Sequence, residues 1–189
     1  MDSTFDQLIE LALVQELTGW DFSWLNERIF EEPLPWNYEV IARSRLANVE
    51  AVLDVDTGGG EFYSRLGPFP MVAWATEGYP PNVSVARSRL EPLGIQVADV
   101  SEIPGLLPFV DNTFDLVLNR HGGLYTTELE RVMHPGGRFL TQQVGSKNCL
   151  DLNRALQDEV DYEYSYCTLD YTVAQLEQAE LQIVQAREV

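Results

Sequence analysis

The stretch VEAVLDVDTGGGEF, residues 49–62, decides the fold of this chain. Its apolar run, Ala51 to Leu53, leads into Asp54 and then into three glycines, Gly58 to Gly60. Such a run is typical of a buried parallel strand, and residues without a Cβ suit a turn that approaches a ligand closely. The segment that follows, Glu61 to Leu66, can begin a helix whose first N–H groups attract an anion. Together they predict the nucleotide-binding corner of a Rossmann-like sheet; an ordinary glycine-rich turn is the alternative.

Beyond this stretch, short apolar segments alternate with helical ones. The pattern predicts further strands at residues 71–75, 95–98, 114–118, 138–143 and 181–186, and helices at 4–17, 38–49, 83–93, 126–133, 149–160 and 171–179. Gly19 and Asp21 should separate the first helix from a short one that carries Trp24 and Phe30, while Asn37 and Asn82 should cap later helices. The alternation predicts an α/β, Rossmann-like, doubly wound and mostly parallel sheet with helices on both faces. We expect six strands in it, with seven as the upper limit.

The composition is that of one folded domain. The chain has 189 residues, 45% of them apolar, which suffices for one core and is short for two. We divide it into a helical flank or lid at 1–36, a cofactor-binding core at 37–145, and C-terminal helices with the last strand at 146–189. Apolar runs fall short of the roughly 18 residues that span a bilayer. The N-terminus lacks a signal pattern, so we expect a cytoplasmic protein without a membrane partner.

The net charge of −18 is concentrated at the two ends of the chain. Residues 1–36 carry eight acids and one arginine, and residues 151–189 carry nine acids and two arginines. An acidic surface repels phosphate backbones, so nucleic acid is disfavoured as a partner. The two cysteines, Cys149 and Cys167, lack the spacing of a metal site and are expected to be free thiols.

Acids stand at the ends of the first three predicted strands: Asp54, Glu77 and Asp99. In a doubly wound sheet these positions share the carboxyl edge, where ligands bind. An acid after the second strand is placed to accept hydrogen bonds from a ribose diol. The alternative is that each acid is a helix cap or a solvated loop charge.

Four segments resemble successive motifs of class I S-adenosylmethionine-dependent methyltransferases. They read VLDVDTGGGEF at 52–62, ATEGYPPNVSVAR at 75–87, LPFVDNTFDLVLNRH at 107–121 and ELERVMHPGGRFLTQQVG at 128–145. The phrases around FDLV and HPGG are the more specific, and nicotinamide dehydrogenases lack them. The combination TGGGE, TEGYPPN, NRH and TQQVG resembles a bacterial subgroup of this superfamily.

The resemblance implies a role for each matching position, with S-adenosylmethionine as cofactor. Gly58 and Gly60 would cradle its methionine part, with Asp54 near the amino group. Glu77 would hold the ribose hydroxyls, and Asp99 with Val100 would contact the adenine. Asn119 would line the methyl-transfer site. Tyr38 and Trp36 would cover the cofactor; the alternative for these two aromatic residues is packing in the core or in a lid.

Asp56 departs from the pattern of the resembled family, which has glycine there. Its carboxylate enters where the backbone should approach the carboxylate of the cofactor. Repulsion between two such groups about 4 Å apart costs on the order of 1–4 kcal/mol, or roughly tenfold to a thousandfold in affinity. We therefore hypothesise that Asp56 weakens cofactor binding, unless it turns outward or meets the sulfonium charge.

The end of the chain is a second departure, because the resembled family has seven strands and this sequence ends after the sixth. An uncovered sheet edge would permit self-association, so a homodimer is one expectation.

Catalysis by methyl transfer needs mainly positioning, with a base only where the nucleophile carries a proton. His121, three residues beyond the fourth predicted strand, is the candidate base, and Asn119 lines the same place. Arg120, Gln142, Gln143 and Tyr125 are candidates for contact with the acceptor, while His134 is interpreted as structural. We expect a methyltransferase acting on a small molecule. The alternatives are a degenerate member that acts as a protein-interaction module, a non-enzymatic partner-binding domain and, last, a nucleotide dehydrogenase.

Overall fold

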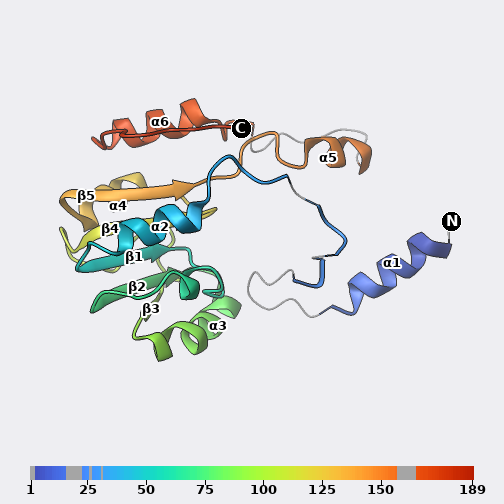
Figure 1. Ribbon diagram of the computed structural model, residues 1–189, viewed down its shortest axis with the longest axis horizontal. Coiled ribbons are helices and arrows are strands. Elements are labelled where there is room, and N and C mark those ends of the chain that lie inside the picture. Colours follow the sequence, from blue (N-terminus) through green and yellow to red (C-terminus); the bar gives the residue numbers. More distant parts are fainter. Residues whose placement is uncertain (1–2, 16–22, 26, 31, 157–164) are drawn as a thin grey trace.

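The computed structural model describes residues 3–15, 23–25, 27–30, 32–156 and 165–189 (Figure 1). The strands are β1 Ala51–Val55, β2 Val72–Glu77, β3 Gln96–Asp99, β4 Phe114–Arg120 and β5 Met133–Gln142. The helices are α1 Ser3–Leu13, α2 Tyr38–Leu46, α3 Pro80–Leu90, α4 Thr126–Val132, α5 Leu150–Leu156 and α6 Leu169–Gln178. Short 3-10 turns are η1 Ser23–Leu25, η2 Tyr63–Arg65 and η3 Glu91–Leu93.

The sheet is parallel throughout and has the order β3-β2-β1-β4-β5. Central strand β1 pairs with β2 on one side, Leu53 opposite Trp74, and with β4 on the other, Val52 opposite Leu116. After β3 the chain crosses over to β4 on the far side of β1. The carboxyl ends of β1 and β4 therefore flank a topological switch point, which is where open α/β sheets bind ligands.

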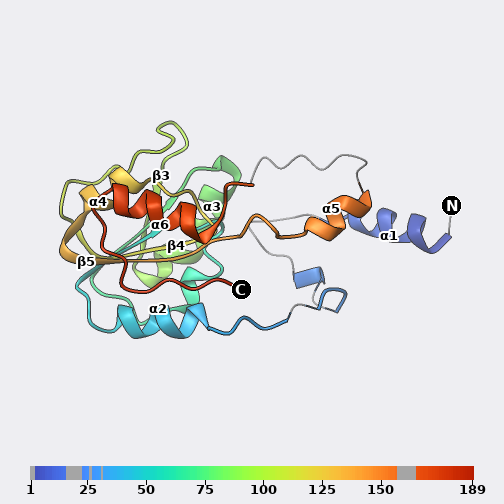
Figure 2. The same cartoon turned by 90° about the horizontal axis from the view of Figure 1, so that it is seen from above.

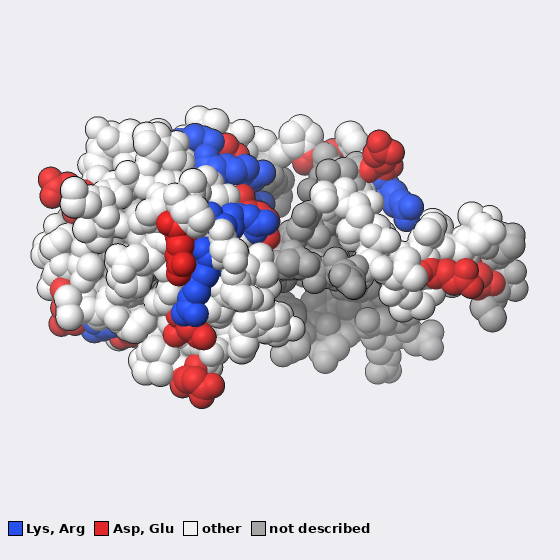
Figure 3. Space-filling model, turned by 90° about the horizontal axis from the view of Figure 1, so that it is seen from below, with Lys and Arg blue, Asp and Glu red and all other residues white. Residues whose placement is uncertain are grey.

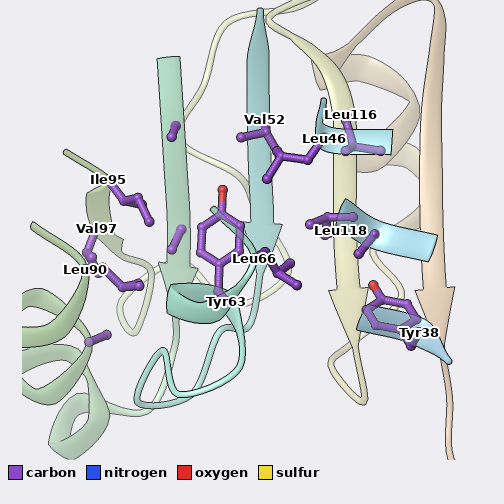
Figure 4. Close-up of a cluster of buried hydrophobic side chains, with 14 residues drawn as sticks. Tyr38, Leu46, Val52, Tyr63, Leu66, Leu90, Ile95, Val97, Leu116 and Leu118 are labelled. Atoms are coloured by element: carbon purple, nitrogen blue, oxygen red, sulfur yellow. The ribbon is translucent and has the colours of Figure 1, made fainter. Parts of the chain in front are cut away.

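Two apolar clusters cover the two faces of this sheet. One lies under α2, η2 and α3 and includes Tyr38, Tyr63 and Leu90 (Figure 4). The other lies under α4 and includes Phe114 and Leu129. The predicted Rossmann-like sheet with helices on both faces is confirmed by this arrangement.

The expected sixth strand at residues 181–186 is wrong. This segment runs back along α6 without pairing to β5 (Figure 1). Leu181 packs against the second cluster, whereas Val184 is 90% exposed. The alternating apolar pattern predicted a strand, but a strand also needs a partner edge, which this segment does not reach. The described residues thus form five strands, and β5 lies at one edge of their sheet.

Several helix boundaries also differ from the expectations. The helix after the glycines is only the turn η2, and the described residues around Trp24 form the turn η1. Asn37 caps α2 as expected, accepting from the N–H of Val40. Asn82 does not cap α3, because proline at the first helical position starts that helix at Pro80. The expectations at Gly19 and Asp21 lie outside the described residues.

Helices α1 and α5 extend away from the sheet at one end of the molecule (Figure 2). The larger apolar side chains of α1 are exposed, among them Phe5, Leu8 and Leu13. Among the described residues, no helix has the length and apolar character to cross a membrane. The division of the chain at residues 36 and 145 stays a prediction.

The loop between β3 and β4 is held to α4 by two side chains, Glu128 and Arg131. The guanidinium of Arg131 donates to the carbonyls of Leu107 and Phe109 and pairs with Glu128 and Asp111. The Glu128 carboxylate also accepts from the N–H of Leu107 at 2.8 Å. The loop that carries part of the cleft described below is therefore fixed from the side of α4.

Arg131→Ala is expected to lower the free energy of unfolding by about 1–3 kcal/mol, because two backbone carbonyls lose a charged donor. Limited proteolysis should show faster cleavage within residues 101–113, and urea unfolding measures the loss. Arg138→Ala, at an exposed position on β5, is the control. Equal stability and equal cleavage in both variants would contradict this assignment.

Candidate active site

A cleft of about 300 Å³ opens at the carboxyl edge of the sheet. Its lining comes from the ends of β1, β2 and β3 and from the loops beyond β1, β2, β3 and β4: Asp56, Glu77, Gly78, Tyr79, Val100, Ser101, Pro104, Gly105 and Tyr125. Parallel strands carry their ligands at this edge because the loops of neighbouring strands meet there. A second hollow of about 360 Å³ lies at the opposite end of β3, beside Ile95 and Gln96. That end of the sheet lacks the strand-ending acids and the glycine loop, so the first cleft is the candidate site.

Glu77 is the buried acid of this cleft, only 5% exposed at the end of β2. Its Oε1 accepts from the N–H of Tyr79 at 2.7 Å. Burial raises the pKa of the carboxyl, whereas hydrogen bonds from the N–H groups of Tyr79 and Gly58 lower it. A fixed acceptor at this position suits the hydroxyls of a sugar.

Asp54 lies behind the cleft within β1, and its carboxyl is 7% exposed. Its pKa is raised to about 7: burial is the largest cause and the charges of Asp56 and Glu77 add to it, while Thr57 and Arg120 lower it. The hydroxyl of Tyr63, buried against the same strand, has no hydrogen-bond partner within the described part of the chain. Asp54 is thus a carboxyl whose charge the fold disfavours, as is common at functional sites.

The glycine loop is stabilised by bonds within the chain. The N–H groups of Asp56 and Thr57 donate to Thr76, and that of Gly60 donates to Thr57. Gly58 has a φ of 65°, a left-handed conformation that favours glycine. A Cβ on Gly60 would lie 2.8 Å from Leu90 of α3, so this glycine permits the loop to pack against a helix.

Asp56 neither turns outward nor lies free in the loop. Its Oδ2 accepts from the N–H of Gly123 at 2.8 Å and from the hydroxyl of Tyr125 at 3.3 Å. The backbone is left-handed, with a φ of 57°, which is uncommon for a residue with a Cβ. A Cβ on Gly122 would lie 2.7 Å from that of Asp56. The glycines after β4 thus make room for the carboxylate of Asp56 after β1.

Asn119 is fully buried and joins three elements. Its Nδ2 donates to the carbonyls of Val55 and Gly123, and its Oδ1 accepts from Thr141 and from Gln143 at 2.6 Å. Its polar atoms are therefore engaged within the chain, and it lies inside β4 rather than after it. The predicted contact with a ligand stays a prediction, and the hydrogen bonds indicate a positioning role.

His121 follows β4 in a left-handed conformation, with a φ of 65°. Gln142 lies between it and Trp36: its Oε1 accepts from the indole N–H at 3.0 Å, and its Nε2 is 3.2 Å from His121 Nε2. Because an indole N–H only donates, the amide must donate to the imidazole, which is therefore neutral with its proton on Nδ1. Partial burial of the ring and the nearby Arg120 lower the pKa of His121, in agreement with a neutral ring.

Other expected site residues are placed differently. Tyr38 is buried, and its hydroxyl donates to the carbonyls of Asn119 and Leu140 (Figure 4), so it anchors α2 to the strand ends. Arg120 lies over the ring of Phe62, 4.7 Å from its centre. Asp99 is exposed, does not line the cleft, and accepts from Ser101, whose hydroxyl lowers the pKa of the acid. Val100 does line it.

The structure therefore brings Asp56, Glu77, Val100 and Tyr125 together and leaves Asp99 outside. His134, interpreted as structural, is exposed near the start of β5, away from the carboxyl edge. The sequence reasoning missed Tyr79 and Ser101 as lining residues. Their positions, each two residues beyond a strand-ending acid, were the available signal.

Comparisons with known proteins agree with this architecture. Residues 53–141 match the family model described as a methyltransferase domain, whereas no curated protein matches the sequence. A SAM-dependent methyltransferase from Aquifex aeolicus has 20% identity and a TM-score of 0.62, over 89% of this chain and 88% of that one. The YcgJ protein from Bacillus subtilis has 20% identity and a TM-score of 0.57, over 78% and 70%.

The cyclase SpnF has 19% identity and a TM-score of 0.58, over 75% of this chain, which spans about half of that protein (54%). Likeness at such identities shows the fold alone, and a cyclase among these structures illustrates that the fold does not fix the reaction. The family match covers residues 53–141, just under half of the chain, and the solved structures show that the chain shares their fold.

Proposed function

We propose that this chain is an S-adenosylmethionine-dependent methyltransferase that acts on a small molecule. The observation that carries the proposal is the buried carboxylate of Glu77 in a cleft at the switch point of the sheet. The match of residues 53–141 to the model of a methyltransferase domain favours this function over the other functions that such a sheet can serve.

The residues of the cleft fit one half of this cofactor. A cleft of about 300 Å³ with a buried acid at its middle strand suits a nucleoside, with Glu77 toward the sugar and Val100 toward the base. The other half would meet the Asp56 carboxylate, which is bonded across that end to Gly123 and Tyr125.

When bound, the cofactor would supply an electrophilic methyl group on a sulfonium. The protein would position the reacting groups and exclude water. The residues that would do so lie at the end of β4 and in the loop after it. Asn119 fixes that loop, and His121 is held neutral by Gln142, so its Nε2 lone pair is already engaged. A role of His121 as base would therefore require Gln142 to release it, for example through the segment around Trp36.

The small-molecule acceptor is proposed from the surface charge, which disfavours nucleic acid. On the face shown in Figure 3, Lys and Arg side chains are interleaved with Asp and Glu instead of forming a continuous basic surface. The net charge of −18 likewise disfavours nucleic acid.

Glu77→Gln is expected to weaken binding of S-adenosylmethionine by roughly tenfold to a hundredfold, because a charged acceptor bond is replaced by a neutral one. Calorimetric titration measures the change, and Glu91→Gln on η3, an exposed position, is the matched control. Equal affinity in both variants would contradict the proposed sugar contact.

A second function is favoured by one observation, the bonded Asp56 carboxylate. The alternative is a degenerate methyltransferase fold that binds its cofactor weakly and serves as an interaction module. Such a protein would keep the contact of Asp56 without any loss of function. Turnover of S-adenosylmethionine with a panel of small acceptors separates the two, since the degenerate protein would bind partners but transfer no methyl group.

A further inference from the structure

The residues that line the cleft follow the order of the strands. Val100 and Ser101 stand beyond β3, Glu77 and Tyr79 at the end of β2, and Asp56 beyond β1. A nucleoside that directs its sugar hydroxyls to Glu77 and its base toward Val100 must point its 5′ substituent toward Asp56. Asp56 is therefore the side chain that meets whatever the 5′ carbon carries.

Two hydrogen bonds fix the Asp56 carboxylate in that position. Gly123 and Tyr125 donate to its Oδ2, and the missing side chain of Gly122 lets its Cβ approach the loop after β4. Two arginines of the described residues are engaged elsewhere and do not neutralise the Asp56 carboxylate: Arg120 lies over the Phe62 ring, and Arg89 pairs with Glu61. Glu77 stands nearby in the same cleft and adds to the negative potential.

We propose that Asp56 acts as a charge filter at the 5′ end of the cleft: it weakens binding of adenosyl ligands that carry an α-carboxylate and favours adenosyl sulfonium ligands that lack one. The proposal rests on the proposed function, because it concerns the same cleft. Two carboxylates brought within about 4 Å weaken binding roughly tenfold to a thousandfold, depending on the solvent that reaches them. A sulfonium cation facing Asp56 is attracted instead.

Two ligands separate these effects, S-adenosylmethionine and its decarboxylated form. Both are sulfonium cations with the same nucleoside, and they differ in the carboxylate. Calorimetric titration at about pH 8 should show at least about tenfold tighter binding of the decarboxylated ligand to the parent protein. In Asp56→Asn, which keeps the size of the side chain, and in Asp56→Gly, which suits the left-handed backbone, this preference should fall to about threefold or less.

Each result decides the proposal. Equal or tighter binding of S-adenosylmethionine by the parent overturns the charge filter and leaves the proposed methyltransferase intact. Binding of only the decarboxylated ligand supports the filter and removes S-adenosylmethionine as the donor. An unchanged preference in folded Asp56→Asn, checked by circular dichroism, overturns the assignment to Asp56. Failure of both ligands to bind any of the three proteins overturns both proposals.

Discussion

Asp54→Asn is expected to stabilise the protein at about pH 8 by about 2–4 kcal/mol. Asp54 is 7% exposed, and burial raises its pKa from 3.8 to about 7 in the folded chain. Between these two values the folded state holds a proton that the unfolded state has released, so stability falls as pH rises through this window and stays reduced above it. An amide in place of the carboxylate removes this loss.

The difference between variant and parent should therefore depend on pH. Near pH 4, where the carboxyl is neutral in the folded state, the substitution should change the free energy of unfolding little. Urea unfolding at several pH values between about 4 and 8 measures both limits. Asp151→Asn, whose side chain is 97% exposed, is the control and should show no such dependence. A stability difference that is the same at all pH values would contradict the assignment to the charge of Asp54.

A carboxyl that costs stability is commonly retained for function. If Asp54 serves the cofactor, Asp54→Asn should gain stability and lose affinity for S-adenosylmethionine together. Affinity that survives the substitution would leave Asp54 without a part in binding.

Asn119→Asp is expected to destabilise the protein by about 3–5 kcal/mol, which is the second large effect. The amide nitrogen donates to the carbonyls of Val55 and Gly123, and an ionised carboxylate there would face two acceptors in a fully buried place. Protonation restores at most one of the two donors. At roughly 2–4 °C per kcal/mol, the melting temperature should fall by about 10 °C.

Differential scanning calorimetry measures this loss, and Asn48→Asp at an exposed position after α2 is the control. A fall of less than about 2 °C would mean that the network around Asn119 contributes little. Because Asn119 also fixes Gly123, the same variant should loosen the contact between Gly123 and Asp56, which amide hydrogen exchange at Gly123 can follow.

The local pattern of the sequence was sufficient for the central elements of the fold. Alternating strand and helix segments, the glycines after β1 and the acid at Glu77 depend on neighbours within a few residues, and parallel pairing then brings the carboxyl ends to one edge. The positions of Asp54 and Glu77 followed from this rule, whereas Val100 was named from the resemblance to methyltransferases.

The orientation of single side chains depends on contacts between segments that are far apart in the sequence. Asp56 accepts from Gly123, and Tyr38 donates to carbonyls of β4 and β5, so no local pattern could predict their directions. For residues 181–186 the apolar alternation was present, but a strand needs a free edge within reach, and this segment lies along α6. The sequence by itself thus determined the central strands of the sheet and the edge at which the cleft lies. Only the tertiary structure decided which carboxylates enter the cleft, because hydrogen bonds between residues far apart in the chain fix their orientation.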